Sequence, residues 1–349
     1  MGIFAPERDH TDGNEAADVL ARARSTVDPA LHAAIDTLPP SMRRIAGYHL
    51  GWWEADGTPC AAGTGKAIRP ALVFAATQAA GGTPAVAVRA AAAVELVHNF
   101  TLLHDDVIDR DRTRRHRPTA WRVFGTTEAI LAGDAMHSLA LRVLAEDAHP
   151  AAPSAVRRLA DCVVELCAGQ QADCAFEQRS DVTLAECLAM AEGKTGALLG
   201  AACAIGALYA GAGEAAADVL DAFGREIGLA FQLIDDLIGI WGDPTVTGKP
   251  VGADLAARKK SLPVVYALSS GTAAAAELAA LYRLDRPLNA AELQQAAAAV
   301  ERAGGRAWAQ GESCERMASA IAHLADAVPD PAAADDLLAL AELVTRRSH

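Results

Sequence analysis

Apolar residues recur every three to four positions through almost the whole chain, which is the spacing of amphipathic α-helices. Clusters of Gly and Pro interrupt the pattern and mark the connections. Runs of alternating apolar and polar residues typical of strands are scarce, so we predict an all-α fold. The predicted helices cover about 15–37, 42–54, 67–81, 84–108, 118–146, 152–178, 183–194, 195–212, 214–241, 261–270, 273–285, 289–304, 306–327 and 331–346.

The pattern also predicts how the chain is organised. Residues 1–14 are polar and interrupted by Gly and Pro, which favours a disordered tail. No linker or repeat divides the rest, so we predict one helical domain over residues 15–349.

The longest apolar run, 197–213, is too short for a membrane span and is read as a buried helix. The N-terminus lacks the apolar core of a secretion signal. We therefore expect no membrane span and a cytoplasmic location.

Composition narrows the class of partner. The 349 residues carry a net charge of −13, which argues against nucleic acid because binding to phosphate backbones needs a basic surface. Hydrophobic residues make up 52% but aromatics only 5%, with alanine filling much of the difference, as suits helices. The seven cysteines are an odd number without C-x-x-C spacing, so we expect small buried thiols in a reducing compartment.

One segment gathers carboxylates at the end of an apolar helix. Asp105 and Asp109 are four residues apart and project from one helix face, with Asp106 beside them. Mg²⁺ prefers such oxygen ligands and completes its shell with water and phosphate. Arg114 and Arg115 follow and could bind the same phosphates. The alternative is a charged helix end that is simply solvated.

A second acidic pair, Asp235–Asp236, favours the metal site over that alternative. It too ends an apolar helix, and it precedes a loop with Lys249 and a further lysine, Lys259. If the two helices face each other, metal ions and a diphosphate could lie between them.

Other basic residues stand where a phosphate could bind. Lys66 and Arg69 begin a predicted helix, where amide groups and the helix dipole favour anions. The segment is not a P-loop, because Ala67 follows the lysine. Lys194 and Thr195 lie at a helix break. His98 is two turns before Asp105; alone it would more often be a core histidine than a ligand.

Together and in this order, these motifs resemble the trans-isoprenyl diphosphate synthases of the polyprenyl synthetase family, from Gly65 to about Pro263. The resemblance implies a helical bundle with a central apolar cavity, in which isopentenyl diphosphate and an allylic diphosphate are condensed. Members of this family typically bind three Mg²⁺ ions together with diphosphate and form homodimers, so the resemblance implies both for this chain. The competing hypotheses are a class I terpene cyclase, although its usual second motif is missing, and a non-catalytic partner subunit of a two-component synthase.

The family's residue roles carry over position by position. The metal ligands would be Asp105, Asp109 and Asp235, supported by Asp106 and Asp236. The allylic diphosphate would be held by Arg114, Lys194, Lys249 and Lys259, and isopentenyl diphosphate by Lys66, Arg69, His98 and Arg115. The expected catalytic residues are Lys194, Thr195 and Gln232, with the last two facing the developing carbocation.

The sequence departs from the family pattern at two positions. Gly239 stands where the second motif usually has its third Asp, so we expect altered metal affinity, although Asp243 could partly substitute. His116 replaces a usual Gly and should change only the local turn.

Product length can be argued from helix geometry. One helical turn rises about 5.4 Å, close to the reach of an isoprene unit, so residues preceding Asp105 should line successive depths of the pocket. Phe100 is large, Thr101 beside it is small, and Val97 lies further down. We predict a C20 product, with C15 next. The alternative is that Phe100 only packs against a neighbouring helix.

Overall fold

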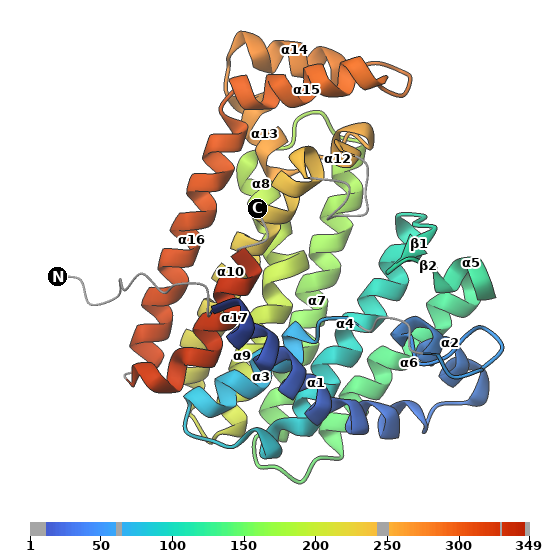
Figure 1. Ribbon diagram of the computed structural model, residues 1–349, viewed down its shortest axis with the longest axis vertical. Coiled ribbons are helices and arrows are strands. Elements are labelled where there is room, and N and C mark those ends of the chain that lie inside the picture. Colours follow the sequence, from blue (N-terminus) through green and yellow to red (C-terminus); the bar gives the residue numbers. More distant parts are fainter. Residues whose placement is uncertain (1–11, 61–64, 243–250, 329, 346–349) are drawn as a thin grey trace. The chain divides into compact units, whose positions relative to one another are not determined.

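The computed structural model describes residues 12–60, 65–242, 251–328 and 330–345. Over these residues the chain is almost entirely helical, so the predicted all-α class is confirmed (Figure 1). The first half contains α1 Asp12–Ile35, α2 Pro40–Leu50, α3 Ile68–Ala79, η1 Pro84–Ala87, α4 Val88–Ile108, β1 Thr113–Arg114, β2 Arg117–Pro118, α5 Ala120–Phe124, α6 Thr126–Ala145 and α7 Ala152–Glu177. The second half contains α8 Leu184–Ala191, η2 Glu192–Gly196, α9 Ala197–Tyr209, α10 Glu214–Trp241, α12 Ala253–Ala256, α13 Leu262–Ser269, α14 Ala273–Tyr282, α15 Ala290–Arg302, α16 Gly305–Ala327, η3 Pro331–Ala334 and α17 Asp335–Thr345.

Most predicted helices match these bounds within a few residues, and the departures have local causes. The helix expected over 42–54 stops at Leu50, because Gly51 adopts a left-handed conformation that caps it. The helix expected over 118–146 is broken at Gly125, whose φ is 101°. A two-stranded ribbon, Thr113–Arg114 with Arg117–Pro118, was not predicted. Residues 12–14, expected in the tail, begin α1; residues 1–11 lie outside the described part.

Residue contacts divide the chain into two compact units, each built from separate segments. Unit 1 comprises residues 1–163, 201–220 and 327–340, and unit 2 comprises 164–200, 221–326 and 341–349. Helices α7, α9, α10 and α17, and the last residue of α16, are divided in this way between the two units. The single-domain organisation stays a prediction, as does the central apolar cavity.

Unit 1 is organised around α4. This helix packs along α6 and also contacts α1 and α3, with the β1–β2 ribbon beyond its C-terminal end (Figure 1). Its apolar residues are buried on nearly every side; Val94, Val97 and Leu103 have no exposed area. A helix that is apolar all round belongs in a core. The acidic segment that follows therefore sits at the end of a firmly held helix.

Unit 2 has two apolar clusters around α13. In one, Val264 packs with residues of α10, α12, α14 and α15. In the other, Leu262 and Val265 pack with residues of α7, α8, α10 and α16. This packing fixes α13, and with it the preceding Lys259, relative to the C-terminal part of α10.

Two further features bear on earlier expectations. By length and composition, Pro84–Ile108 and Leu184–Tyr209 could each cross a membrane, but 72% and 78% of their most apolar windows are buried, as in core helices. The absence of a membrane span stays a prediction.

All seven cysteines are free thiols, as expected. Only Cys162, Cys187 and Cys203 are buried. The expectation of burial was wrong for Cys167 and Cys314, which are exposed, and is met only in part by Cys60 and Cys174.

Candidate active site

The first acidic motif closes α4. Asp105 is partly exposed, Asp106 is buried and Asp109 is exposed. The backbone N–H of Asp109 donates to the carbonyl oxygen of Asp105 at 2.8 Å, so helical geometry continues to the cap. Asp105 and Asp109 therefore share one helix face, as predicted.

Asp106 is held inside unit 1 by Arg114. The Arg114 guanidinium donates from Nη2 and Nε to Asp106 Oδ1, at 2.7 and 2.8 Å. Burial raises the pKa of the Asp106 carboxyl, and the Arg114 hydrogen bond and charge oppose that rise. Its second oxygen, Oδ2, is buried without a hydrogen-bond partner. The structure thus pairs a predicted supporting ligand with a predicted diphosphate-binding arginine.

The β1–β2 ribbon presents Arg114 and Arg115. Its two-residue turn, Arg115–His116, has φ values of 51° and 62°, the left-handed pair that a type I′ hairpin turn requires. Glycine adopts this conformation without strain, which explains why a Gly suits position 116. His116 does so at some conformational cost while keeping the turn.

Arg117 fastens the ribbon to α2 and the loop after it. Its guanidinium donates to the carbonyl oxygens of Tyr48 and Trp53 and forms an ion pair with Glu54. The Tyr48 hydroxyl donates to the carbonyl oxygen of Pro118 at 2.8 Å. The positions of Arg114 and Arg115 therefore depend on α2, a link that sequence spacing did not indicate.

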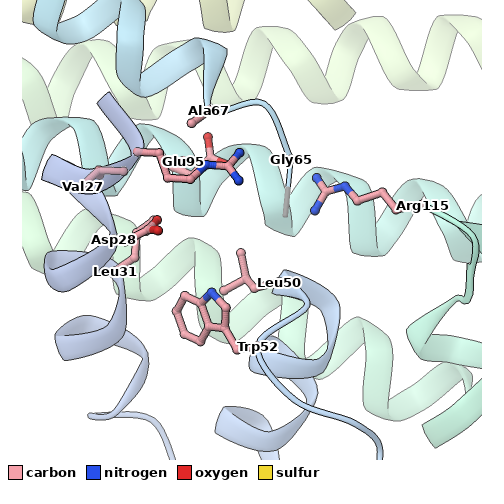
Figure 2. A pocket seen from close by; sticks show the side chains of 10 residues that line it. Val27, Asp28, Leu31, Leu50, Trp52, Gly65, Ala67, Glu95 and Arg115 are labelled. Atoms are coloured by element: carbon pink, nitrogen blue, oxygen red, sulfur yellow. The ribbon is translucent and has the colours of Figure 1, made fainter. Parts of the chain in front are cut away.

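A second basic group of unit 1 surrounds Arg115 and α3. The guanidinium of Arg115 extends over Gly65 (Figure 2), and a side-chain carbon at Gly65 would lie 2.6 Å from Arg115 Nη2. A larger residue at position 65 would displace the end of the Arg115 side chain. Lys66 is exposed just before α3. Arg115, one of the predicted isopentenyl diphosphate ligands, therefore lies beside the residues that precede α3.

Arg69 and His98 contact each other directly. Arg69 Nη1 lies 3.1 Å from His98 Nε2. Burial, followed by the charges of Arg69 and Arg115, holds the pKa of His98 well below its usual 6.5. A guanidinium can only donate, so Nε2 of this neutral imidazole accepts and Nδ1 carries the proton.

Four unpredicted residues complete this group: Arg24, His49, Glu95 and Asn99. Glu95 is buried and receives a hydrogen bond from Asn99 Nδ2 at 3.0 Å. Burial raises the pKa of Glu95, and the charges of Arg69, Arg115 and Arg24 act against that rise. Glu95 faces the pocket of Figure 2 together with Arg115. The EL-x-H spacing of Glu95 and His98, one helical turn apart, was the signal that could have identified it.

The second acidic motif lies on α10, in unit 2. Asp235 is exposed, whereas Asp236 is 3% exposed. Asp236 Oδ1 accepts a hydrogen bond from Gln232 Nε2 at 2.9 Å, and Oδ2 accepts one from the backbone N–H of Leu262 at 2.8 Å. Lys259 Nζ lies 3.8 Å from Oδ1. Burial raises the pKa of Asp236 to about 6.

Gln232 connects Asp236 to Thr195. The Thr195 hydroxyl donates to Gln232 Oε1 at 2.8 Å, and the Gln232 amide donates to Asp236. Because an ionised carboxylate only accepts, Asp236 fixes the orientation of the Gln232 amide, which in turn makes Thr195 the donor. The structure therefore brings Thr195, Gln232 and Asp236 together in one chain of hydrogen bonds.

Thr195 and Lys194 lie in η2, a single π-helical turn between α8 and α9. Such turns occur often at functional sites. The turn packs against α7: a side-chain carbon at Gly169 would lie 2.5 Å from the backbone nitrogen of Lys194. Lys194 Nζ forms an ion pair with Asp173 of α7 at 2.6 Å. Asp173 was not predicted, and only its place near Gly169–Gln170 in an apolar helix could have suggested it.

Lys259 lies among four carboxylates of unit 2. Partial burial works against its charged form, but Asp236, Asp254, Asp173 and Asp235 together raise the pKa of Lys259 above its usual value. Two predicted residues, Lys249 and Asp243, lie outside the described part of the chain.

The three chain-length residues are buried on α4. The exposed fraction is 0% for Val97, 6% for Phe100 and 7% for Thr101. The Phe100 ring packs against His137 of α6, with ring centroids 5.1 Å apart, and edge-on against His104 at 5.6 Å. Phe100 thus contacts a neighbouring helix, as the alternative required, and its role as a ruler stays a prediction.

The donor set suits magnesium. Asp105 and Asp109 in unit 1, and Asp235 in unit 2, each offer only oxygen atoms, the ligands that Mg²⁺ prefers; the buried Oδ2 of Asp106 lacks a hydrogen-bond partner. Among the described residues, no three Asp, Glu, His or Cys side chains converge as a complete metal site.

Comparison with known proteins identifies the family. The family model described as polyprenyl synthetase matches residues 58–300, more than half of the chain. A geranylgeranyl diphosphate synthase of Mycobacterium tuberculosis is 52% identical over 94% of this chain and 93% of its own length. A (2E,6E)-farnesyl diphosphate synthase of the same species is 49% identical over 91% and 89%. Both names favour a condensing enzyme over a cyclase or a non-catalytic subunit.

The fold agrees with this relationship. The crystal structure of a polyprenyl synthetase from Streptomyces coelicolor A3(2) matches with a TM-score of 0.89 and 45% sequence identity. The match covers 94% of this chain and 98% of that one.

Proposed function

The chain belongs to the polyprenyl synthetase family, and we propose that this short-chain prenyltransferase makes geranylgeranyl diphosphate (C20). Farnesyl diphosphate (C15) is the next candidate. The two mycobacterial relatives are almost equally similar, so overall identity does not decide between these products. The observation that carries the proposal is Phe100, a large side chain below Asp105 that is braced by His137 of α6 and flanked by the small Thr101.

We assign the substrates to two sets of residues. Arg114, Lys194, Lys249 and Lys259 would hold the allylic diphosphate, and Lys66, Arg69, His98 and Arg115 would hold isopentenyl diphosphate. The Arg69–His98 contact supports the second set, because a neutral His98 with a protonated Nδ1 is a hydrogen-bond donor. Asp106 binds the edge of the Arg114 guanidinium formed by Nε and Nη2, which leaves its other N–H groups to donate to phosphate.

Asp105, Asp109 and Asp235 would hold magnesium, on which the family depends. Three ions are expected with bound diphosphate. Magnesium, when bound, would neutralise the charge that grows on the departing diphosphate. Asp106 and Asp236 are buried in ion pairs and hydrogen bonds, so we assign them to positioning Arg114, Gln232 and Lys259.

The reaction needs no nucleophilic side chain. The bond between the allylic carbon and the diphosphate oxygen breaks, and both electrons leave with the diphosphate. The alkene of isopentenyl diphosphate supplies the pair for the new carbon–carbon bond. The departed diphosphate would then take a proton next to the resulting cation, and the electron pair of that C–H bond forms the new double bond. Thr195 and Gln232 would present oxygen lone pairs to the cation; the hydrogen bond between them fixes their orientation. Apolar surroundings would keep water from the cation.

A homodimer and a cytoplasmic location are further expectations for this chain.

The test of product length removes the proposed ruler. Purified protein would be incubated with Mg²⁺, labelled isopentenyl diphosphate and C5, C10 or C15 allylic diphosphate. We expect a C20 product, and Phe100→Ala should lengthen it by at least one isoprene unit. Leu102→Ala is the matched control, since it lies about 200° around α4 from Phe100 and should leave product length unchanged.

Two outcomes would contradict the proposal. A Phe100→Ala enzyme with unchanged product length would exclude the ruler, and the absence of a prenyl product with every starter would exclude the activity.

A further inference from the structure

The α14–α15 hairpin (residues 273–302) carries none of the residues assigned above, yet it contacts the segment that presents Lys259. This segment, Arg258–Lys260, is a turn and irregular backbone between α12 and α13. Within unit 2, α14 and α15 lie above α12 and α13 in Figure 1, and α15 contacts α12 while α14 contacts α13. The hairpin is therefore placed to act on the conformation of this segment.

Tyr282, the last residue of α14, contacts the segment at two points. Its hydroxyl donates to the carbonyl oxygen of Lys259 at 3.4 Å. Its ring lies beneath the Lys260 ammonium, with Nζ 5.2 Å from the ring centroid, which is within the range of a cation–π interaction. The side chain packs against the apolar cluster that contains Leu255 and Val264, and burial raises the pKa of its hydroxyl. Tyr282 is thus a firmly held hydrogen-bond donor.

Arg258 adds a second link to the hairpin. Its φ is 54°, the left-handed conformation in which a residue other than glycine is strained. Its guanidinium donates to the backbone carbonyl oxygen of Arg286, in the loop between α14 and α15. The hairpin thus holds the side chain of a strained residue directly before Lys259, as well as the carbonyl group of Lys259 itself.

The remaining backbone groups of the segment are held by other helices. The Lys259 N–H donates to the carbonyl oxygen of Asp254 in α12 at 2.9 Å. The carbonyl oxygen of Lys260 accepts the Cys187 thiol of α8 at 3.2 Å. Tyr282 supplies the contact from the side of α14. An irregular segment is therefore fixed by partners from three directions, which sets the point from which the Lys259 side chain starts.

We propose that Tyr282 is a positioning residue for the allylic diphosphate site and acts through the backbone of Lys259. The proposal rests on the assignment of Lys259 to that diphosphate, which belongs to the proposed function. A lysine ammonium sits on a flexible four-carbon stem, so its position depends on where the backbone is held. Tyr282 holds this backbone and supports the neighbouring Lys260 at the same time. The α14–α15 hairpin therefore contributes to substrate binding without touching the substrate.

The experiment separates the hydroxyl of Tyr282 from its ring. Tyr282→Phe removes only the hydrogen bond to Lys259, and Tyr282→Leu also removes the aromatic support of Lys260. Tyr266→Phe is the matched control, a tyrosine of the same unit whose ring stacks on Trp308. Steady-state assays with Mg²⁺ would measure KM for the C10 allylic diphosphate and KM for isopentenyl diphosphate separately, and thermal unfolding would report stability.

Amide hydrogen exchange of the peptide 255–262 gives a second measurement that needs no reaction. Exchange reports how often a backbone hydrogen bond opens. We expect Tyr282→Leu to speed exchange in this peptide and Tyr266→Phe to leave it unchanged. The absence of product from the wild-type chain would show that the proposed function is wrong, whereas unchanged exchange in Tyr282→Leu would show that this inference is wrong.

In the assays, Tyr282→Phe should raise KM for the allylic diphosphate about threefold, as the loss of one weak neutral hydrogen bond implies. Tyr282→Leu should raise it about tenfold, because the contact with Lys260 is lost as well. KM for isopentenyl diphosphate should stay within about twofold of the wild-type value. A residue that only stabilised the fold would lower the fraction of active enzyme, and with it kcat, and would leave the ratio of the two KM values unchanged.

Two further results would overturn the inference. One is a ratio of the two KM values that neither Tyr282 variant changes. The other is an equal change of that ratio in Tyr266→Phe, which would show that the effect is not specific to Tyr282. If Tyr282→Leu does not fold, Tyr282→Phe decides alone, because it keeps the packed ring: a wild-type KM for the allylic diphosphate would exclude the role of the hydroxyl.

Discussion

The Asp–Asp pairs of α4 and α10 are the same dipeptide near the ends of two helices, and in both the second aspartate is the buried one. Asp106 is 1% exposed and Asp236 is 3% exposed, whereas Asp105 and Asp235 are partly or largely exposed. Each pair therefore combines an outward carboxylate, available to a ligand, with an inward carboxylate that the protein itself uses.

The pairs differ in how the inward carboxylate is satisfied. Asp106 relies on Arg114, a side chain of a small hairpin, and one of its oxygens has no hydrogen-bond partner. Asp236 is held by the Gln232 amide, the Leu262 backbone and Lys259. Leaving the buried backbone N–H of Leu262 without an acceptor costs more free energy than leaving Arg114 without its partner, because Arg114 is partly exposed and can hydrogen-bond to water. The α4 pair thus orients an arginine, and the α10 pair joins α10 to the segment 259–262.

The largest effect should follow loss of an outward carboxylate. Asp105→Asn or Asp235→Asn should lower kcat by roughly two to three orders of magnitude, because the charge that develops on diphosphate loses its stabilisation. Folding stability should change by less than about 1 kcal/mol, since both side chains are at least partly exposed. Steady-state assays and urea unfolding measure the two effects, with exposed Asp18→Asn and Asp285→Asn as controls. If Asp235→Asn retained its activity, the proposal that the outward aspartates bind the ligand and the inward ones bind protein groups would be wrong.

A smaller effect should distinguish the two inward carboxylates. Asp236→Ala should lower the free energy of unfolding by about 2–4 kcal/mol, because the Leu262 N–H is left buried without an acceptor. Asp106→Ala should cost only about 1 kcal/mol, because Arg114 is 29% exposed and regains water. Urea unfolding of both variants at one pH gives the comparison. An equal loss, or a larger loss for Asp106→Ala, would show that the hairpin depends on its ion pair as strongly as α13 does.

The effect that is smallest at neutral pH and grows only on acidification concerns His49, which faces Arg115 and Arg114 and lies with Asp106 on one pocket of unit 1. Burial, then those arginines, lowers the pKa of His49 from 6.5 to about 3. Between pH 6.5 and about 3, His49 is therefore protonated in the unfolded chain but neutral in the folded chain. Stability from this group is complete above pH 6.5 and is lost as the pH falls toward 3, by up to about 1.4 kcal/mol per pH unit.

His49→Gln should flatten this pH dependence, and urea unfolding between pH 4 and pH 7 would measure the slope. His149→Gln serves as a control for a histidine of unit 1 outside this pocket. A slope that His49→Gln leaves unchanged would show that another group titrates.

The sequence alone determined the helices and the candidate residues, because both depend on local chemistry. Helical periodicity gave nearly every element, and α10 agrees with its predicted bounds of 214–241. The charged motifs could be recognised because Mg²⁺ and diphosphate demand particular side chains in a fixed order. The wrongly predicted helix boundaries also have local causes. Gly51 and Gly125 end helices through their backbone conformations, which the spacing of apolar residues does not indicate.

Only the tertiary structure decided which aspartate of each pair turns inward. Asp105 and Asp106 are chemically identical neighbours, and what separates them is the packing of α4 and the reach of Arg114 from the ribbon. The same holds for Glu95 beneath the arginines and for Tyr282 beside Lys259. These partners come from segments up to tens of residues away, and a sequence pattern carries no information about which distant groups meet. Burial and pairing, which set charge and orientation, arise only once those segments are packed together.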